Sequence, residues 1–164
     1  MLTVNKESLK KYALKYLARY ASSKKNLIIV LNRKLDRSIN KEKKEYELYK
    51  NDIINIVNDL EKNNIINDES FANSKAYSYI NTGKSIRSIK YNLIKKGIEK
   101  HHINNALKRL EETMPNLEME SAINFARKKK LGRFGNLDKK EKDLSKMSRA
   151  GFSYGVSLEA LGYE

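Results

Sequence analysis

The sequence predicts an all-α protein made of three consecutive units of three helices each. Apolar residues recur at helical spacing along nearly the whole chain of 164 residues, and no segment alternates apolar and polar residues over the length of a strand. One proline and seven glycines are too few for the many turns of a β-sandwich or barrel. Several residues also recur at one fixed offset, which indicates repeated units.

The first unit is expected to span residues 1–63. Its first helix covers residues 6–21, where apolar residues follow helical spacing. Ser22 and Ser23 interrupt that pattern, and a serine there can cap a second helix through Leu27, Leu31 and Leu35. Residues 36–47 are polar and are expected to form a loop or a frayed helix end, before a third helix at about 48–63.

The second unit is expected to span residues 64–113. Asp68 is placed to cap a helix that carries Phe71 and Ala72 on its apolar face. The stretch from Gly83 to Leu107 then predicts a helix, a short turn and a second helix. Gly97 follows the last periodic turn, where a helix end favours a residue that tolerates positive φ.

The third unit is expected to span residues 114–164. After Pro115 the apolar spacing predicts a helix, and the two glycines within 131–137 predict a loop. Asp138 is placed to cap the next helix, which Gly151 ends. Phe152 follows as an apolar residue, and a last helix is expected at about 153–161.

The second and third units match at an offset of 54 residues. This offset relates Gly97 to Gly151, Ile98 to Phe152, and Leu93 to Met147. It also relates the Phe-Ala pair at 71–72 to that at 125–126. A unit of about 50 residues is marginal alone, so neighbouring units are expected to bury shared faces.

Charge is concentrated in alternating zones. The chain has a formal net charge of +14, and the zones 6–50, 84–109 and 127–164 contribute +9, +7 and +5. The two intervening zones, 51–83 and 110–126, are net −3 and −4. This pattern favours a polyanionic partner such as DNA or RNA together with an acidic or mixed protein partner.

The chain contains no cysteine, and its first residues, MLTVNKESLKK, lack the apolar core of a signal peptide. No run reaches the roughly 18 apolar residues of a membrane span. We therefore expect a cytoplasmic monomer that does not enter a membrane.

The candidate binding residues are basic side chains of the second and third units. Their proposed role is ion pairing with phosphates and with acidic side chains of a partner. They are Lys84, Arg87, Lys90, Lys95, Lys96, Arg127, Lys128, Lys129, Lys130, Arg133 and Arg149. Asp68, Phe71, Gly97, Gly151 and Phe152 are assigned structural roles.

Patterns that suggest catalysis have simpler explanations. The Gly-Lys-Ser at 83–85 lacks the first glycine of a phosphate loop, because Ser78 occupies that position. His101 and His102 are neighbours, so on a helix they should point about 100° apart and not chelate one metal together. Most of the ten tyrosines fall on apolar faces, whereas Tyr154 and Phe134 lie beside basic residues. We expect no catalytic residue, no metal and no cofactor.

Three segments of the chain share one family pattern. They are ALKYLARYASSKKNLIIVL at 13–31, NDESFA at 67–72 with GKSIRSIKYNLIKKGI at 83–98, and FARKKKLGRFGNLDKKEKDLSKMSRAGFSYGV at 125–156. Together they resemble the RecX family of regulators of the RecA recombinase. Matching residues include Arg19, Ser23, Asp68, Glu69, Phe71, Ala72, Lys96, Gly97, Arg127, Lys128, Arg149, Gly151, Phe152 and Tyr154. Asn26, Asn92, Tyr20 and Ala150 depart from the family pattern, which leaves individual polar contacts open.

The resemblance implies tandem three-helix repeats in an elongated, curved body. It also implies binding in the groove of the RecA–DNA filament, with suppression of ATP hydrolysis and strand exchange. The expected context is therefore homologous recombination, DNA repair and the SOS response. A protein that binds DNA or RNA independently of RecA is the alternative, and a nuclease would need a convincing ligand set.

Overall fold

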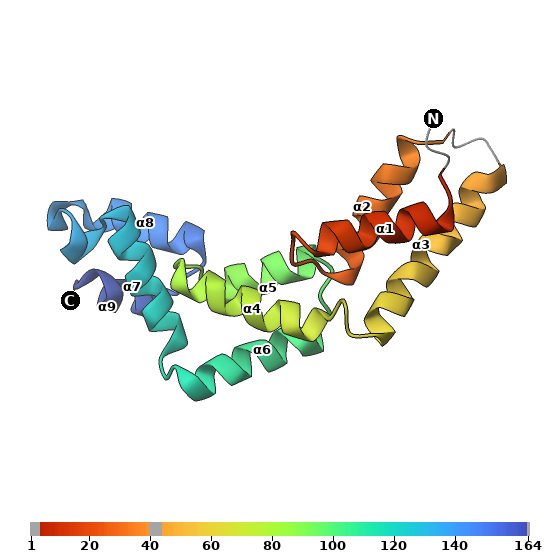
Figure 1. Cartoon of the computed structure of the whole chain (residues 1–164). Helices are drawn as coiled ribbons and strands as arrows, with labels where there is room; N and C mark the ends of the chain where they lie inside the picture. The colour runs from red at the N-terminus through yellow and green to blue at the C-terminus, as the bar shows by residue number, and fades with distance from the viewer. Residues whose placement is uncertain (1–3, 40–43, 164) are drawn as a thin grey trace. The chain divides into compact units, whose positions relative to one another are not determined.

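A computed structural model describes residues 4–39 and 44–163. These residues form nine α-helices and two short 3-10 turns, without a strand (Figure 1). The predicted all-α fold is therefore confirmed. The helices are α1 (Lys6–Leu17), α2 (Lys24–Asp36), α3 (Lys44–Lys62), α4 (Asp68–Asn81), α5 (Ile86–Lys95), α6 (Lys100–Thr113), α7 (Leu117–Lys129), α8 (Lys140–Ala150) and α9 (Tyr154–Leu161).

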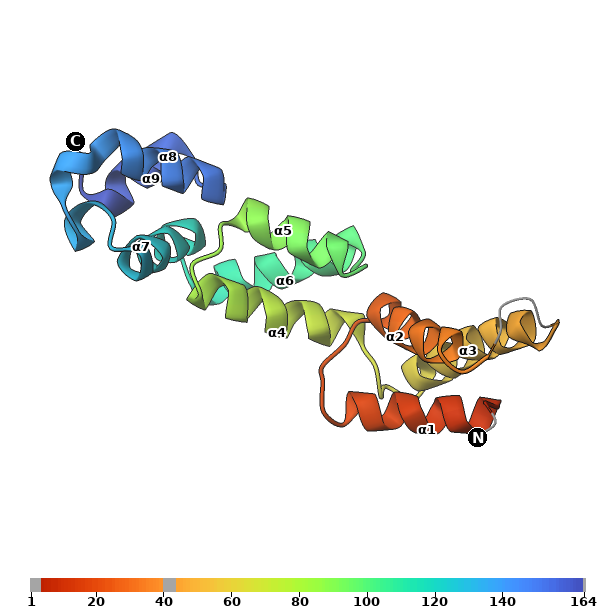
Figure 2. The same cartoon turned by 90° about the horizontal axis from the view of Figure 1, so that it is seen from above.

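The chain divides into two compact units. The N-terminal unit comprises the described residues up to Phe71 together with Lys96–Ile98. The C-terminal unit comprises Ala72–Lys95 and the described residues from Glu99 onward. In the N-terminal unit, α1, α2 and α3 lie side by side (Figure 2). In the C-terminal unit, α5 packs on α6, and α9 packs on α7 and α8.

An aliphatic core holds α1, α2 and α3 together. Its largest fully buried members are Leu9, Leu27, Leu31, Leu35, Ile53, Ile56 and Leu60. Complete burial of one such side chain stabilises the fold by about 1.5–3 kcal/mol. The helical spacing of these residues is the reason that the sequence predicted the three helices.

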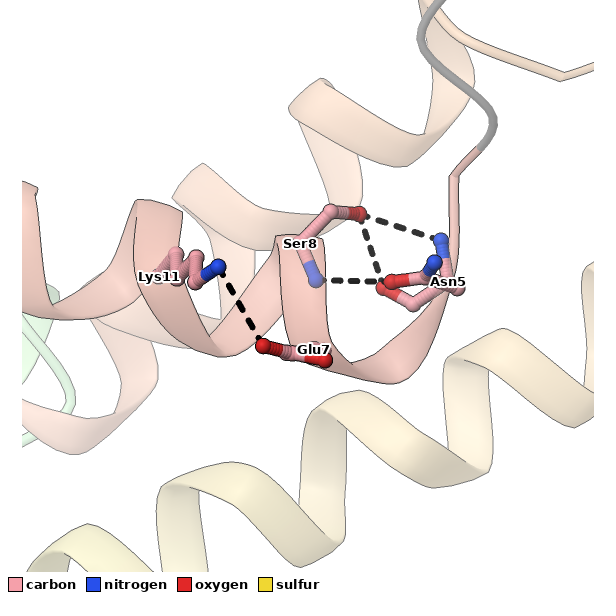
Figure 3. Close-up of polar contacts among 4 residues, drawn as sticks. All are labelled: Asn5, Glu7, Ser8 and Lys11. Atoms are coloured by element: carbon pink, nitrogen blue, oxygen red, sulfur yellow. Dashed lines mark hydrogen bonds and ion pairs between the residues drawn. The ribbon is translucent and has the colours of Figure 1, made fainter.

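Helix α1 begins with a reciprocal cap. The Asn5 Oδ1 accepts from the Ser8 backbone N–H at 2.8 Å, and the Ser8 Oγ accepts from the Asn5 N–H at 3.0 Å (Figure 3). This pairing satisfies two backbone donors that a helix start leaves open. Regular α1 ends at Leu17, earlier than the predicted 21, yet the Tyr20 N–H still donates to the Tyr16 carbonyl at 2.9 Å.

Helix α3 begins at Lys44, four residues before the predicted start at 48. Tyr46, within the predicted polar loop, is buried, and its hydroxyl donates to Asp36 Oδ1 at 2.5 Å. The polar composition of residues 36–47 predicted no helix there, although Tyr46 extends the buried face of α3, with Tyr49 and Ile53 at i+3 and i+7. Residues 40–43 of the predicted loop lie outside the described residues.

The structure corrects the capping role predicted for Asp68. The side chain of Asn67, not that of Asp68, accepts from the Ser70 N–H at the start of α4, at 2.9 Å. Asp68 is the first residue of α4 and accepts instead from the backbone N–H of Lys24, at 2.8 Å. Asp68 therefore satisfies an open donor at the start of α2, a role that depends on tertiary contact.

Gly97 adopts φ +80°, which confirms the predicted left-handed helix end. The last carbonyl before it, of Lys96, accepts from the Ser23 Oγ at 2.6 Å. A side chain at position 97 would also collide with the aliphatic stem of Lys25. Glycine is therefore required twice here, for conformation and for space.

The C-terminal unit contains a second junction of the same kind. The Ser85 Oγ donates to the carbonyl of Ala150 at 2.7 Å, directly before Gly151, whose φ is +96°. The N–H of Ile86 donates to Glu118 Oε2 at 2.9 Å. In each junction, a capping serine donates to the last carbonyl before a left-handed glycine. The backbone N–H of the residue after that serine donates to a carboxylate.

These bonds align α4 with α7, the first helices of the second and third three-helix units, at an offset of 50 residues. Asp68 and Glu118 make the same bond, and the buried alanines at 72 and 76 correspond to those at 122 and 126. The pairing of the two Phe-Ala motifs at an offset of 54 is therefore wrong for α4 and α7. The later glycines keep 54, because the third unit has a longer connection between its first two helices.

That connection, residues 130–139, also overturns a predicted cap. It contains the 3-10 turns η1 (Gly132–Phe134) and η2 (Leu137–Lys139). Asp138 lies inside η2, where its N–H donates to the Asn136 side chain at 2.9 Å. Helix α8 starts at Lys140 without a side-chain cap. Asp138 therefore does not cap α8.

Glu118 provides a test of the second junction. Burial raises the pKa of its carboxyl above 4.5, and the hydrogen bond from Ile86 opposes this in part. Because the folded state binds this proton more tightly than the unfolded state does, the raised pKa contributes its full stabilisation at pH values below the pKa of Glu118 in the unfolded chain. This contribution is lost as the pH rises through the pKa of Glu118 in the folded protein. Glutamine keeps an acceptor without the charge. We expect the unfolding free energy of Glu118→Gln to increase relative to wild type between about pH 4 and pH 7.

Urea denaturation followed by circular dichroism at a series of pH values measures this difference. Glu118→Ala lacks the acceptor and should lose about 1 kcal/mol relative to Glu118→Gln at each pH. The exposed Glu120, changed to Gln, controls for removal of a charge from the same helix. If the unfolding free energy of Glu118→Gln relative to wild type stays constant or falls across this pH range, burial does not raise the pKa of the Glu118 carboxyl.

Candidate nucleic-acid interface

Three adjoining hollows in the C-terminal unit form a basic groove. Their volumes are about 330, 480 and 600 Å³. Ala150 lines all three, and each neighbouring pair shares at least one further residue. The side chains that define the groove are Lys84, Arg87, Ser88, Tyr91, Phe125, Lys128, Lys129, Lys146 and Arg149.

Among the described residues, six basic side chains and no acidic side chain line the groove. Five were predicted from sequence, namely Lys84, Arg87, Lys128, Lys129 and Arg149. The sixth, Lys146, was missed, although it precedes Arg149 by three residues and so shares its helix face. Its Nζ lies 3.6 Å from Asp143 Oδ1. Concentrated positive charge in a concave surface favours binding of a polyanion.

Side-chain hydrogen bonds hold the start of α5 against α7 and α8. The Ser121 Oγ on α7 donates to the Lys84 carbonyl at 2.6 Å, and the Ser85 bond to Ala150 fixes the end of α8. Gly83 has φ +80°, and a Cβ there would lie 2.6 Å from the backbone nitrogen of Phe125. These three contacts fix the backbone at the start of α5 relative to α7 and α8, the helices that carry the other basic side chains of the groove.

Two aromatic rings border the groove. Phe125 is half-buried, and its ring centroid lies 5.6 Å from that of the buried Phe152. Tyr91 is 65% exposed and lines the hollow shared with Arg87 and Arg149. Neither ring was a sequence candidate, since a lone aromatic residue on a helix more often marks a core position. Exposed aromatic faces beside phosphate-binding groups can stack on bases.

The remaining predicted residues lie outside the groove. Lys90 and Lys95 are exposed on α5, and Lys96 belongs to the N-terminal unit. Lys130 ends α7 in the left-handed conformation, with φ 52°. Five of the eleven predicted residues therefore line the groove, and the other six are not among its lining residues.

Arg127 and Arg133 form a second basic feature around Phe134. Their guanidinium carbons lie 5.3 and 5.1 Å from the centroid of the Phe134 ring. A hypothetical Cβ at Gly162 would lie 3.2 Å from the Arg133 Cδ, so that the stem of Arg133 packs on this glycine. Cation–π contacts of this kind hold two positive groups near one ring. Tyr154, the other aromatic candidate, is 68% exposed.

The structure also bears on the histidine pair. The rings of His101 and His102 lie with centroids 3.9 Å apart, so the prediction that they point apart is wrong. Even so, the described part of the chain holds no group of three or more His, Cys, Asp or Glu side chains arranged for a metal ion. Among the described helices, none is long and apolar enough to cross a membrane.

Comparison with known proteins identifies similar chains. A sequence profile for "RecX, second three-helix domain" matches residues 67–107. A regulatory protein RecX from Myxococcus xanthus is 35% identical over 158 residues, which cover 93% of this chain and 83% of that protein. The crystal structure of RecX from Lactobacillus salivarius aligns with a TM-score of 0.67 at 27% identity, covering 96% of this chain and 94% of the other.

A second crystal structure, of a regulatory protein RecX, aligns with a TM-score of 0.65 and covers 96% of this chain and 71% of the other. Its sequence identity of 21% supports the fold alone. The matches extend over both compact units, so they concern nearly the whole chain.

Proposed function

Since this chain belongs to the RecX family, we propose that it is a non-enzymatic regulator that binds the RecA–DNA filament. Binding is proposed to lower RecA's ATP hydrolysis and strand exchange, and thereby to modulate homologous recombination and DNA repair, including the SOS response. The proposed partners are the RecA filament and single- and double-stranded DNA. The chain is proposed to act as a cytoplasmic monomer.

The basic groove carries this proposal. Its six cationic side chains and lack of acidic lining match the phosphates of DNA or the carboxylates of a protein groove. We further propose three three-helix units at residues 1–63, 64–113 and 114–164. The match of a three-helix domain to residues 67–107 supports the second of them.

DNA-dependent ATP hydrolysis by RecA tests the proposal. We expect hydrolysis to fall as this protein is added and to approach a floor at saturation. A DNA-dependent helicase on the same DNA is the control, because a protein that only covers DNA should inhibit both enzymes. Unchanged RecA hydrolysis at saturating protein would refute the proposal. Equal inhibition of both enzymes would instead favour the alternative of RecA-independent binding to DNA or RNA, which the charge of the groove alone would explain.

A further inference from the structure

Three tyrosines form a ladder on the N-terminal unit, far in sequence from the groove residues. Tyr12, Tyr16 and Tyr20 recur every four residues along α1 and the turn that follows it. Four residues of helix rise about 6 Å, so these side chains follow one another along one face. The ring centroids of Tyr16 and Tyr20 lie 5.1 Å apart. We call these three residues the tyrosine ladder.

The ladder is accessible to a ligand. Tyr12 is 37% exposed and Tyr20 is 57% exposed. Tyr16, between them, is half-buried and anchored, since its hydroxyl accepts from the Asn26 Nδ2 at 3.1 Å. The middle ring is therefore tied to α2, while both outer rings face solvent.

A row of basic side chains runs beside the ladder. Lys11, Lys15 and Arg19 each precede one of the tyrosines and are exposed. Lys11 already pairs with Glu7 at 3.2 Å (Figure 3), which leaves Lys15 and Arg19 as the main cations of the row. From α2, the Lys34 Nζ lies 5.7 Å from the centroid of the Tyr12 ring. Aromatic rings in series beside cations in series are the components of a single-strand stacking platform.

From this arrangement we propose that the tyrosine ladder, with Lys15, Arg19 and Lys34, binds single-stranded DNA. Unpaired bases stack on the outer rings, and the strand's phosphates pair with the adjacent cations. A duplex cannot use the rings, because its bases are already stacked on one another. The choice of DNA over RNA rests on the proposed function, whereas the single-strand preference rests on the ladder alone.

The first test uses the unmodified full-length chain without RecA. A 20-nucleotide thymidine oligomer that carries 5-iodouracil is irradiated with the protein, and adducts are mapped by mass spectrometry. We expect adducts at Tyr12, Tyr16 or Tyr20. Adducts confined to other residues would overturn the proposal, and no folding defect can confuse this result.

The second test compares affinities measured by fluorescence anisotropy. Tyr12→Leu/Tyr20→Leu should bind the thymidine oligomer at least about 10-fold more weakly, since one stacked base contributes about 1–3 kcal/mol. Its affinity for a 20-base-pair duplex should change less than about twofold. Tyr77→Leu is the matched control, because Tyr77 is 54% exposed in the C-terminal unit. It should change neither affinity.

Three outcomes would contradict the proposal: unchanged affinity for the single strand, equal losses for single strand and duplex, or tighter binding to a uridine oligomer than to the thymidine oligomer. If circular dichroism shows that the leucine variant is unfolded, Tyr12→Phe/Tyr20→Phe keeps both rings and should retain binding, and the adduct map decides the location. RecA is absent from these assays, so their failure is distinct from failure to alter RecA's ATP hydrolysis.

Discussion

Gly132→Ala should destabilise the C-terminal unit by about 3 kcal/mol or more. Gly132 is buried and has φ +51°, a region in which an alanine costs roughly 1–2 kcal/mol. A Cβ there would collide with the backbone oxygen of Leu161 and lie 2.9 Å from its Cα. Backbone atoms cannot move aside as a flexible side chain can, and overpacking of this kind costs a further 1–3 kcal/mol or so.

Asp143 increases the cost of any shift at this position. The N–H of Gly132 donates to Asp143 Oδ2 at 2.9 Å, and the Asp143 side chain is only 3% exposed. Displacement of Gly132 would therefore leave a buried carboxylate without its backbone donor. An unsatisfied buried acceptor costs about 1–3 kcal/mol.

Gly155→Ala is the matched control for this prediction. Gly155 lies inside α9, and no atom lies within 4 Å of a Cβ placed there. The same substitution should therefore stabilise the protein slightly, by up to about 1 kcal/mol, because glycine is costly in a helix. Urea denaturation followed by circular dichroism measures both variants. Equal unfolding free energies for the two would show that the turn after α7 does not constrain the fold.

Helix positions were predictable because each depends on a local pattern. Leu27, Leu31 and Leu35 lie on one face of any helix they form, and burial of that face fixes α2. Left-handed glycines 97 and 151 were predictable for the same reason, since each directly follows the last periodic turn. These features require no knowledge of the rest of the chain.

Capping partners were not predictable in the same way. Asp68 has the composition of a cap, but its carboxylate accepts from Lys24, which lies 44 residues earlier. The cap of α4 is Asn67, one position before it. Choice between two adjacent capping residues depends on backbone dihedrals and on distant donors, and neither is visible in a single sequence.

The groove was predictable only in part. Charge concentration identified Lys128 and Lys129, but it identified Lys90 and Lys95 equally well, although these lie outside the groove. Which face of α5 meets α7 and α8 depends on the bonds of Ser85 and Ser121. The tyrosine ladder was missed because spacing alone cannot separate a core tyrosine from an exposed one.

Charge reversal in the groove should weaken binding to RecA–DNA filaments by about 100-fold. The variant Lys128→Glu/Lys129→Glu/Arg149→Glu changes three side chains that line the groove. Loss of three exposed ion pairs of up to about 1 kcal/mol each corresponds to roughly that factor. All three side chains are exposed, so the helical content measured by circular dichroism should be kept. Inhibition of RecA's ATP hydrolysis should fall in parallel.

An equal change of charge elsewhere separates the groove from net charge. Lys100, Lys108 and Lys142 are exposed and lie outside the groove, and their replacement by Glu changes the net charge by the same amount. In co-sedimentation at about 0.15 M salt, general attraction over more than about 8 Å is screened, while direct pairs are screened less. This control should therefore lose less than about threefold. If both variants lose affinity equally, binding depends on the overall positive charge and the groove is not the binding site.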